Sequence, residues 1–271
     1  MCGRLQVGNG FLQMREILRS IPGFIPAARA ARNILSGRNF TPTYNEDCLI
    51  TNHWIPTDAK FDAAYSHAVD LGLAVDPNIR WRAHTICWAA KIGVKLDGAF
   101  VECGVNRGFL SRIIVDYLEH TPQFYLLDTY KGFDENTLSQ QQIEGLRRAH
   151  KSRGSVGDWR QGMYVECYDA VVKTFSDKPQ VKIIRGTVPN TLPLVTEDKI
   201  AFLSLDMNCA APEIAAIKYF WPKMSKGAVV VLDDYGHIGH DEQRHAFDDW
   251  SSSNNVPLLS LPTGQGLIIR P

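Results

Sequence analysis

Five short apolar runs, separated by stretches of helical character, fill the chain from residue 98 onward. Most of these runs are continuous and not alternating, which is typical of parallel strands covered by helices on both faces. Repeated strand–helix units of this kind predict a doubly wound α/β sheet. The expected parallel strands are Ala99–Cys103, Phe124–Asp128, Val181–Arg185, Ile200–Asp206 and Ala228–Asp233.

The end of the chain follows a different pattern. Two apolar segments, Pro257–Leu261 and Leu267–Arg270, flank a short turn that contains glycine. Segments joined so closely pair as an antiparallel hairpin. We therefore expect a seven-stranded, mostly parallel sheet with a C-terminal antiparallel hairpin. The expected helices between the strands are Phe109–Leu118, Gln140–Arg148, Tyr168–Phe175, Pro212–Met224 and Asp241–Ser251.

The first part of the chain lacks the strand–helix alternation. We expect residues 1–78 to form a helical or irregular extension that caps the site, and residues 79–271 to form the α/β domain. Helical patterning predicts helices at Asp58–Leu73 and Ile79–Ile92. Arg82 and His84, on the second of these helices, are placed to cover a ligand, although packing is the more common role for a residue such as His84.

An acid and two glycines follow the first strand in the spacing Glu-x-Gly-x-x-x-Gly. Glycines let the backbone turn sharply and approach a ligand closely, and the following helix offers unpaired N–H groups at its start. The spacing differs from the Gly-x-Gly-x-x-Gly of dinucleotide sites, which disfavours an NAD-dependent oxidoreductase. The acid suits a ligand with a cationic amino-acid end, such as S-adenosylmethionine, although a purely structural turn has the same pattern. The candidate cofactor residues here are Glu102, Gly104, Asn106, Arg107, Gly108 and Ser111.

Acidic residues end four of the five expected parallel strands. Ligands of open α/β sheets bind beyond the carboxyl ends of the strands, so these acids converge on one candidate site. Asp128, which Thr129 follows, is placed to accept both hydroxyls of a ribose; a helix N-cap or turn acid is the alternative. Gly186 follows the third strand at the same edge and completes the expected cofactor site.

A second group of oxygen ligands follows the fourth and fifth strands. Asp206, Asn208, Asp233 and Asp234 form a set that suits a hard cation such as Mg²⁺. The alternative is a group of hydrogen-bonding acids without a metal. Asp206 or His237 is the candidate base that accepts a substrate proton.

Bulk composition excludes several classes of protein. Lys plus Arg and Asp plus Glu both number 29, so the net charge is zero and no nucleic-acid partner is expected. The six cysteines are scattered without zinc-ligand spacing and indicate free thiols of a reducing compartment. Apolar runs long enough to span a membrane are absent from the sequence, so we expect a cytoplasmic protein. Self-association into a homo-oligomer stays open.

Several segments together resemble a known family. They lie between about residues 80 and 270 and occur in the family's order. The segments are Phe100–Gly108, Leu127–Phe133, Gly186–Pro193, Leu203–Asn208, Gly227–Gly236 and Gln243–Trp250. The chain resembles a class I S-adenosylmethionine-dependent methyltransferase of Rossmann-like fold. More closely, it is similar to the macrocin O-methyltransferase family, whose members methylate sugar hydroxyls of macrolide and aminocoumarin antibiotics.

The resemblance implies roles for residues at both parts of the site. Glu102, Gly104 and Asp128 would hold the methyl donor, whereas Asp206, Asp233 and Asp234 would surround Mg²⁺ and the acceptor hydroxyl. The family usually has Asp-Gly-Asp after the fourth strand, but this chain reads Asp206-Met-Asn208. An amide can ligate a cation but cannot serve as a base. Either Asp206 is then the base, or metal dependence is weakened, or the acceptor differs.

The sequence thus predicts an S-adenosylmethionine-dependent, Mg²⁺-assisted O-methyltransferase. Its partner would be a small-molecule acceptor whose hydroxyl belongs to a sugar or a glycosylated compound. Two alternatives remain: a catechol-type O-methyltransferase, and a binding protein that keeps the fold without catalysis.

Overall fold

The computed structural model describes residues 43–44, 49–50, 59–73, 78–140, 142–144, 147, 164–237 and 239–271. The chain divides into two compact units, Met1–Ile55 and Pro56–Pro271. In the first unit, strand β1 (Thr43–Tyr44) pairs antiparallel with β2 (Leu49–Ile50). The sequence-based boundary after residue 78 lies inside the second unit, and that unit contains the sheet.

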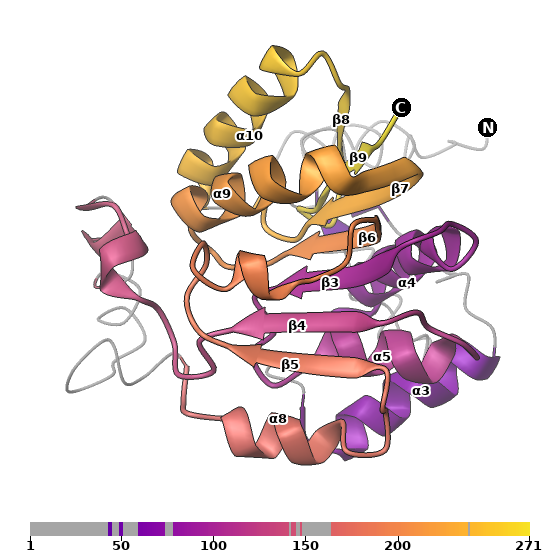
Figure 1. Cartoon of the computed structure of the whole chain (residues 1–271). Helices are drawn as coiled ribbons and strands as arrows, with labels where there is room; N and C mark the ends of the chain where they lie inside the picture. The colour runs from indigo at the N-terminus through magenta and orange to yellow at the C-terminus, as the bar shows by residue number, and fades with distance from the viewer. Residues whose placement is uncertain are drawn as a thin grey trace, which may run out of the picture. The chain divides into compact units, whose positions relative to one another are not determined.

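The second unit is built on a seven-stranded sheet with the order β5-β4-β3-β6-β7-β9-β8 (Figure 1). Strands β3 to β7 run parallel, whereas β9 is antiparallel to both β7 and β8. The predicted mostly parallel sheet with a C-terminal hairpin is therefore confirmed. The strands are β3 (Ala99–Cys103), β4 (Phe124–Asp128), β5 (Val181–Arg185), β6 (Ile200–Leu205), β7 (Met224–Leu232), β8 (Leu258–Ser260) and β9 (Gly266–Ile269).

The helices alternate with the strands as expected. Of the predicted helix Gln140–Arg148, only Gln140, residues 142–144 and residue 147 are described, and they are helical; the rest lies outside the described residues. The helices are α3 (Ala59–Asp70), α4 (Arg80–Gly93), α5 (Phe109–Tyr117), α8 (Tyr168–Thr174), α9 (Ala210–Phe220) and α10 (Asp241–Ser253), and the 3-10 turns are η1 (Glu135–Thr137), η2 (Leu192–Leu194) and η3 (Trp221–Lys223).

The boundary between α9 and β7 differs from the prediction. Helix α9 ends at Phe220 because Pro222 lies in the 3-10 turn η3 that follows it. Strand β7 begins at Met224, four residues before the expected start. Met224 is buried, but the next three residues are half-exposed or exposed, so this stretch lacks the continuous apolar pattern that revealed the other strands.

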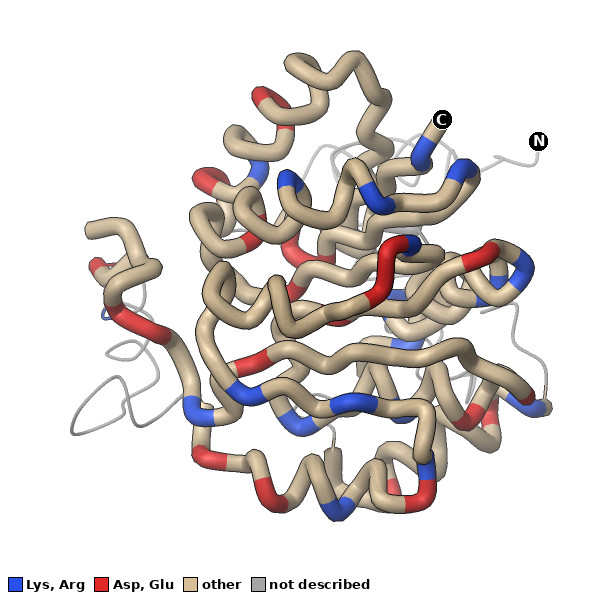
Figure 2. Tube along the Cα trace, in the orientation of Figure 1, with Lys and Arg blue, Asp and Glu red and all other residues tan. Residues whose placement is uncertain are grey.

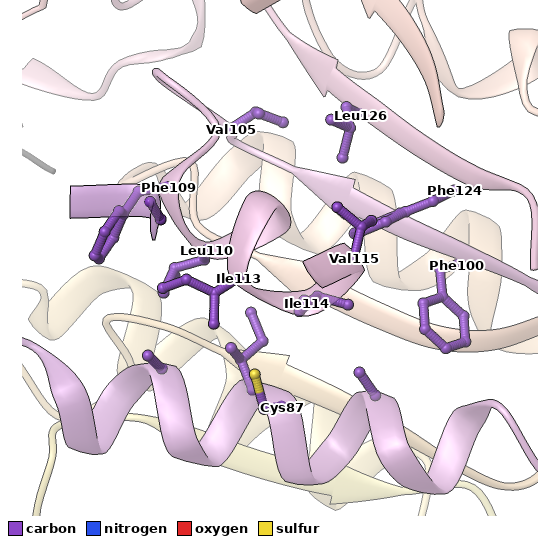
Figure 3. Packing of buried hydrophobic residues seen from close by; sticks show 14 of the residues in the cluster. Cys87, Phe100, Val105, Phe109, Leu110, Ile113, Ile114, Val115, Phe124 and Leu126 are labelled. Atoms are coloured by element: carbon purple, nitrogen blue, oxygen red, sulfur yellow. The ribbon is translucent and has the colours of Figure 1, made fainter. Parts of the chain in front are cut away.

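Both faces of the sheet are buried, which explains the continuous apolar runs. Side chains alternate along each strand, so Phe100 and Phe202 pack toward α3, α4 and α5, whereas Val101 and Leu203 pack toward α9 and α10. In Figure 3, residues of α5 lie next to Cys87 of α4 beneath the central strands. Each fully buried large apolar side chain contributes roughly 1.5–3 kcal/mol to folding.

Two surface properties of the described residues bear on the expected partners. Basic and acidic positions are interspersed along the chain in Figure 2. None of the described helices combines the length and apolar character that crossing a bilayer requires.

The four described cysteines are free and buried: Cys87, Cys103, Cys167 and Cys209.

Candidate functional site

A cavity opens at the carboxyl ends of strands β3, β4, β5 and β6. It is open to solvent, and the space between its lining atoms, open solvent included, is about 800 Å³. This is the edge where ligands of open α/β sheets bind. Of the residues predicted from the sequence, those that line it are Gly104, Asn106, Asp128, Thr129, Gly186, Asp206 and Asn208.

The loop between β3 and α5 depends on its two glycines. Gly104 has a φ of +90°, and a Cβ there would lie 2.0 Å from the backbone oxygen of Asp206. Gly108 has a φ of +80°, and its Cβ would lie 2.6 Å from the Phe175 ring. Both positions therefore exclude larger residues for steric reasons as well as conformational ones.

Asp128 fixes this loop through its carboxylate. Its Oδ2 accepts hydrogen bonds from the backbone N–H groups of Val105 at 2.6 Å and Asn106 at 2.8 Å. Its Oδ1 accepts one from the N–H of Tyr130 at 2.6 Å. These contacts are those of a turn acid. Asp128 also lines the cavity, and its contact with a ribose stays a prediction.

Glu102 is buried and is not one of the described residues that line the cavity. It is 2% exposed, and the Ser111 hydroxyl donates a hydrogen bond to its carboxylate. Burial raises the pKa of Glu102 to about 8. Among the described residues, the predicted cofactor residues Glu102, Arg107, Gly108 and Ser111 are not part of the cavity lining.

The acids after β6 and β7 come together as predicted. One carboxylate oxygen from each of Asp206, Asp233 and Asp234 lies within 4.8 Å of the other two. Burial, followed by repulsion from Asp233 and Asp234, holds the pKa of Asp206 well above its usual range. Asn208, with a φ of +57°, lines the cavity beside them.

Arg82 of α4 binds this acid cluster directly. Its Nε donates to Asp233 Oδ1 at 3.2 Å, and its Nη2 donates to Asp234 Oδ1 at 2.9 Å and to the Asp233 carboxylate. The ion pair was not predicted from the sequence, because it joins residues 151 positions apart and no local pattern indicates it. The expectation that Arg82 covers a ligand stays a prediction.

The acid cluster does not fit Mg²⁺ as arranged. Three carboxylates are suitable hard ligands. However, both oxygens of Asp233 and one of Asp234 already accept hydrogen bonds from Arg82. A cation on the same oxygens would meet the guanidinium charge at hydrogen-bond distance.

His237 lies near Asp234 and His240, in the turn that follows β7. One ligand atom from each of Asp234, His237 and His240 lies within 4.8 Å of the others, and the two histidine rings are 5.7 Å apart. The Nδ1 of His240 is 2.6 Å from Gln243 Oε1. The described cavity lining includes Asp206 but not His237, so Asp206 is the better-placed candidate base.

Two further features were not predicted from the sequence. Glu213 is buried and accepts hydrogen bonds from the Met207 N–H and the Gln243 side chain, both at 3.0 Å; burial raises its pKa to about 8. In the sequence, Glu213 is an ordinary acid in the first turn of a helix. Phe133 and Tyr164 line the cavity with their rings 5.1 Å apart, but no motif marks this pair.

Comparison with known proteins identifies related sugar methyltransferases. A curated protein of Streptomyces olivaceus, 8-demethyl-8-(2,3-dimethoxy-alpha-L-rhamnosyl)-tetracenomycin-C 4'-O-methyltransferase, is 23% identical over 145 residues. The match covers 52% of this chain and 54% of that protein. The chain thus matches about half the length of this curated relative.

Solved structures show the same fold. The O-methyltransferase NovP superposes with a TM-score of 0.56 at 21% identity, covering 70% of this chain and 79% of NovP. The calicheamicin methyltransferase CalS11 superposes with a TM-score of 0.52 at 16% identity, covering 80% of this chain and 95% of CalS11. The family model for macrocin-O-methyltransferase (TylF) matches residues 80–259, which span the sheet from α4 to β8. The chain therefore belongs to the macrocin-O-methyltransferase (TylF) family.

Proposed function

We propose that this chain is an S-adenosylmethionine-dependent O-methyltransferase that acts on a hydroxyl of a sugar or a glycosylated small molecule. One observation carries the proposal: the glycine loop, Asp128 and Asp206 meet in one cavity. Ligands of open α/β sheets bind at this edge, beyond the carboxyl ends of the parallel strands. Membership of the family supports the same reaction class.

The donor would bind along the β3, β4 and β5 ends of the cavity. Asp128 and Thr129 offer oxygen atoms to the ribose, and Gly186 leaves room beside them. The side chains of Phe133 and Val188 add apolar surface that suits an adenine ring. These contacts support S-adenosylmethionine as the donor.

Methyl transfer itself needs positioning and one proton acceptor. The acceptor oxygen attacks the methyl carbon, the carbon–sulfur bond breaks, and S-adenosylhomocysteine leaves as a neutral thioether. Holding the oxygen about 3–3.5 Å from the methyl carbon supplies most of the rate. The hydroxyl proton would pass to the carboxylate of Asp206, which lines the cavity. Its raised pKa makes that carboxylate a stronger base than an ordinary aspartate.

Three sequence predictions stay predictions. Mg²⁺ assistance is one, and the ion pairs of Arg82 with Asp233 and Asp234 argue against it. Cytoplasmic location and self-association are the other two. The sugar acceptor draws support from the name of the Streptomyces olivaceus relative, which denotes a rhamnosyl 4'-O-methyltransferase.

Calorimetry with S-adenosylmethionine and S-adenosylhomocysteine tests the donor. We expect both to bind the wild-type chain and Asp206→Asn with similar affinity, because Asp206 is assigned to the proton and not to the donor. Failure of the chain to bind either compound would contradict the transferase function. It would equally contradict a binding protein that keeps the fold and holds the same ligand without catalysis.

Transfer of a tritiated methyl group tests the acceptor class. The probes are methyl α-L-rhamnoside, a nucleoside-diphosphate-activated rhamnose and catechol. We expect label on at least one sugar and none on catechol. Label on catechol alone would replace the sugar proposal with the catechol alternative, and donor binding without label on any hydroxyl compound in a wider screen would favour a binding protein.

A further inference from the structure

We infer that the guanidinium of Arg82 takes the place of a divalent cation in the acid cluster of Asp206, Asp233 and Asp234, so that this chain needs no added metal. The inference rests on the proposed methyltransferase function for its catalytic part. Its structural part, that Arg82 and a divalent cation compete for the same oxygens, stands independently.

The contacts of Arg82 match those of a cation bound at the end of β7. Its Nη2 donates to the backbone oxygen of Asp233 at 3.0 Å and to Asp234 Oδ1 at 2.9 Å. Its Nε donates to Asp233 Oδ1 at 3.2 Å, and Nη2 also reaches Asp233 Oδ2. One guanidinium therefore collects oxygens from two carboxylates and one carbonyl, which is the hard-oxygen set that a divalent ion prefers.

The ion pair is buried, and Gln265 forms hydrogen bonds to both Arg82 and Asp233. Asp233 and Asp234 are 4% and 9% exposed. The Gln265 side chain, itself fully buried, donates to Asp233 Oδ1 at 2.9 Å and to the backbone oxygen of Arg82 at 3.4 Å. Gln265 thus holds both partners, and the contact is not a chance surface ion pair of negligible stability.

The negative charges of the acid cluster stabilise the charged guanidinium of Arg82. Burial alone would lower the pKa of its guanidinium, but the charges of Asp233, Asp234 and Asp206 outweigh burial and raise it.

The residue beside the cluster agrees with this arrangement. Asn208, two residues after Asp206, is an amide and adds no negative charge at this edge of the sheet. A divalent ion gains less from such a cluster. Arg82 is accordingly proposed as a positioning residue, because it contacts Asp233 and Asp234 and is not among the described residues that line the cavity.

Metal binding provides a test that needs no acceptor. Wild type, Arg82→Met and Arg82→Lys are titrated with Mg²⁺ and Mn²⁺ by calorimetry and followed by thermal unfolding. We expect no metal binding and no stabilisation of wild type. Arg82→Met, whose acids are freed, should bind the metal and gain thermal stability from it by mass action. Arg82→Lys keeps a charge without the planar fork and should fall between them.

Arg80→Met is the matched control. Arg80 lies on the same helix but pairs with Asp62 and packs over the Tyr65 ring at 4.6 Å, away from the acid cluster. It should leave metal binding unchanged. Metal binding by wild type that stabilises the fold would overturn the inference, and so would Arg82→Met and Arg82→Lys that bind no metal although they fold.

Turnover gives the second measurement. With the sugar acceptor that shows label, chelation should change wild-type turnover by less than about twofold, whereas Arg82→Met should lose about tenfold or more and recover in part with Mg²⁺. Loss of wild-type turnover on chelation, restored by Mg²⁺, would overturn the inference while the transferase function stands. If wild type binds neither donor nor product, the proposed function fails, but the metal titrations still decide the competition between Arg82 and the ion.

Discussion

Gly104 and Asp206 touch backbone to backbone, so closely that a Cβ on Gly104 would lie 2.0 Å from the carbonyl oxygen of Asp206. The two residues follow neighbouring parallel strands, and the N–H of Asp206 donates to the oxygen of Cys103 at 2.8 Å. The loop assigned to the donor and the backbone of the residue assigned to the proton are therefore in direct contact. A change that displaces the backbone of either residue is expected to move the other, whereas a change confined to the Asp206 side chain is not.

Gly104→Ala should damage both donor binding and stability. The added methyl group forces apart two backbones, and overpacking of this kind costs roughly 1–3 kcal/mol or more. Positive φ adds about 1–2 kcal/mol for a residue with a Cβ. We expect a lower midpoint in urea and at least about tenfold weaker S-adenosylmethionine binding by calorimetry.

Gly72→Ala separates the effect of the steric clash at Gly104 from the effect of a positive φ. Gly72 has a φ of +70°, but a Cβ there would meet nothing within 4 Å. Its stability loss should equal the backbone strain alone, with donor affinity unchanged. Equal effects of the two substitutions on donor binding would contradict the role given to the Gly104–Asp206 contact.

Asp128→Asn should loosen the glycine loop. Both carboxylate oxygens of Asp128 accept backbone N–H groups, from Val105, Asn106 and Tyr130. An amide has one oxygen, so its NH₂ group must face at least one N–H donor, and an unsatisfied buried group costs about 1–3 kcal/mol. Stability and donor affinity should fall together. Asp97→Asn, which removes an exposed ion pair with Lys199, is the control and should change stability by less than about 1 kcal/mol.

The sheet was predictable from sequence because its strands are buried on both faces. Phe100 and Val101 point to opposite faces and both are fully buried, so the run reads as apolar without a break. The start of β7 at Met224 was missed because half-exposed residues interrupt its pattern. The acids at the strand ends were found for a topological reason, since parallel strands end at one edge.

Contacts between distant elements were not predictable in the same way. Arg82 lies 151 residues from Asp233, and its helical position resembles any other basic residue of an amphipathic helix. Glu213 and Gln243 meet only because α9 and α10 pack on the same face. Sequence patterns indicate which face a residue occupies, but they do not indicate which partner lies across it.

Glu213→Gln should change how stability depends on pH. Burial raises the pKa of Glu213 from an ordinary 4.5 to about 8, so the folded chain holds a proton there that the unfolded chain releases. Wild-type stability from this group is greatest below pH 4.5 and falls as pH rises to about 8, because the folded state then buries a charge. Glutamine keeps an oxygen for the Met207 N–H without a charge.

Urea unfolding between pH 5 and pH 9 measures this difference. We expect Glu213→Gln to approach wild-type stability at the acidic end and to exceed it increasingly at the alkaline end, by about 1 kcal/mol or more. Glu166→Gln, which removes an exposed ion pair with Arg185, should show no such trend. A stability difference that stays constant with pH would contradict a raised pKa for Glu213.

Asp206→Asn should reduce turnover while sparing the donor. Asp206 lines the cavity, and among the described residues its carboxylate receives no hydrogen bond from a side chain, in contrast to Asp233. It is therefore the acid with oxygens to offer to a hydroxyl. Loss of a general base costs about 10²–10⁴-fold in rate. We expect a fall of that size in kcat, measured as tritiated methyl transfer, with donor affinity by calorimetry close to wild type.

His237→Gln decides between the two candidate bases. His237 is near Asp234 but is not among the described residues that line the cavity, so its replacement should lower kcat by less than about tenfold. If His237→Gln instead abolishes turnover and Asp206→Asn retains it, the proton passes to the histidine. Asp206 would then serve with Asp233 and Asp234 to place the acceptor hydroxyl, and the raised pKa of its carboxyl would reflect crowding and burial alone.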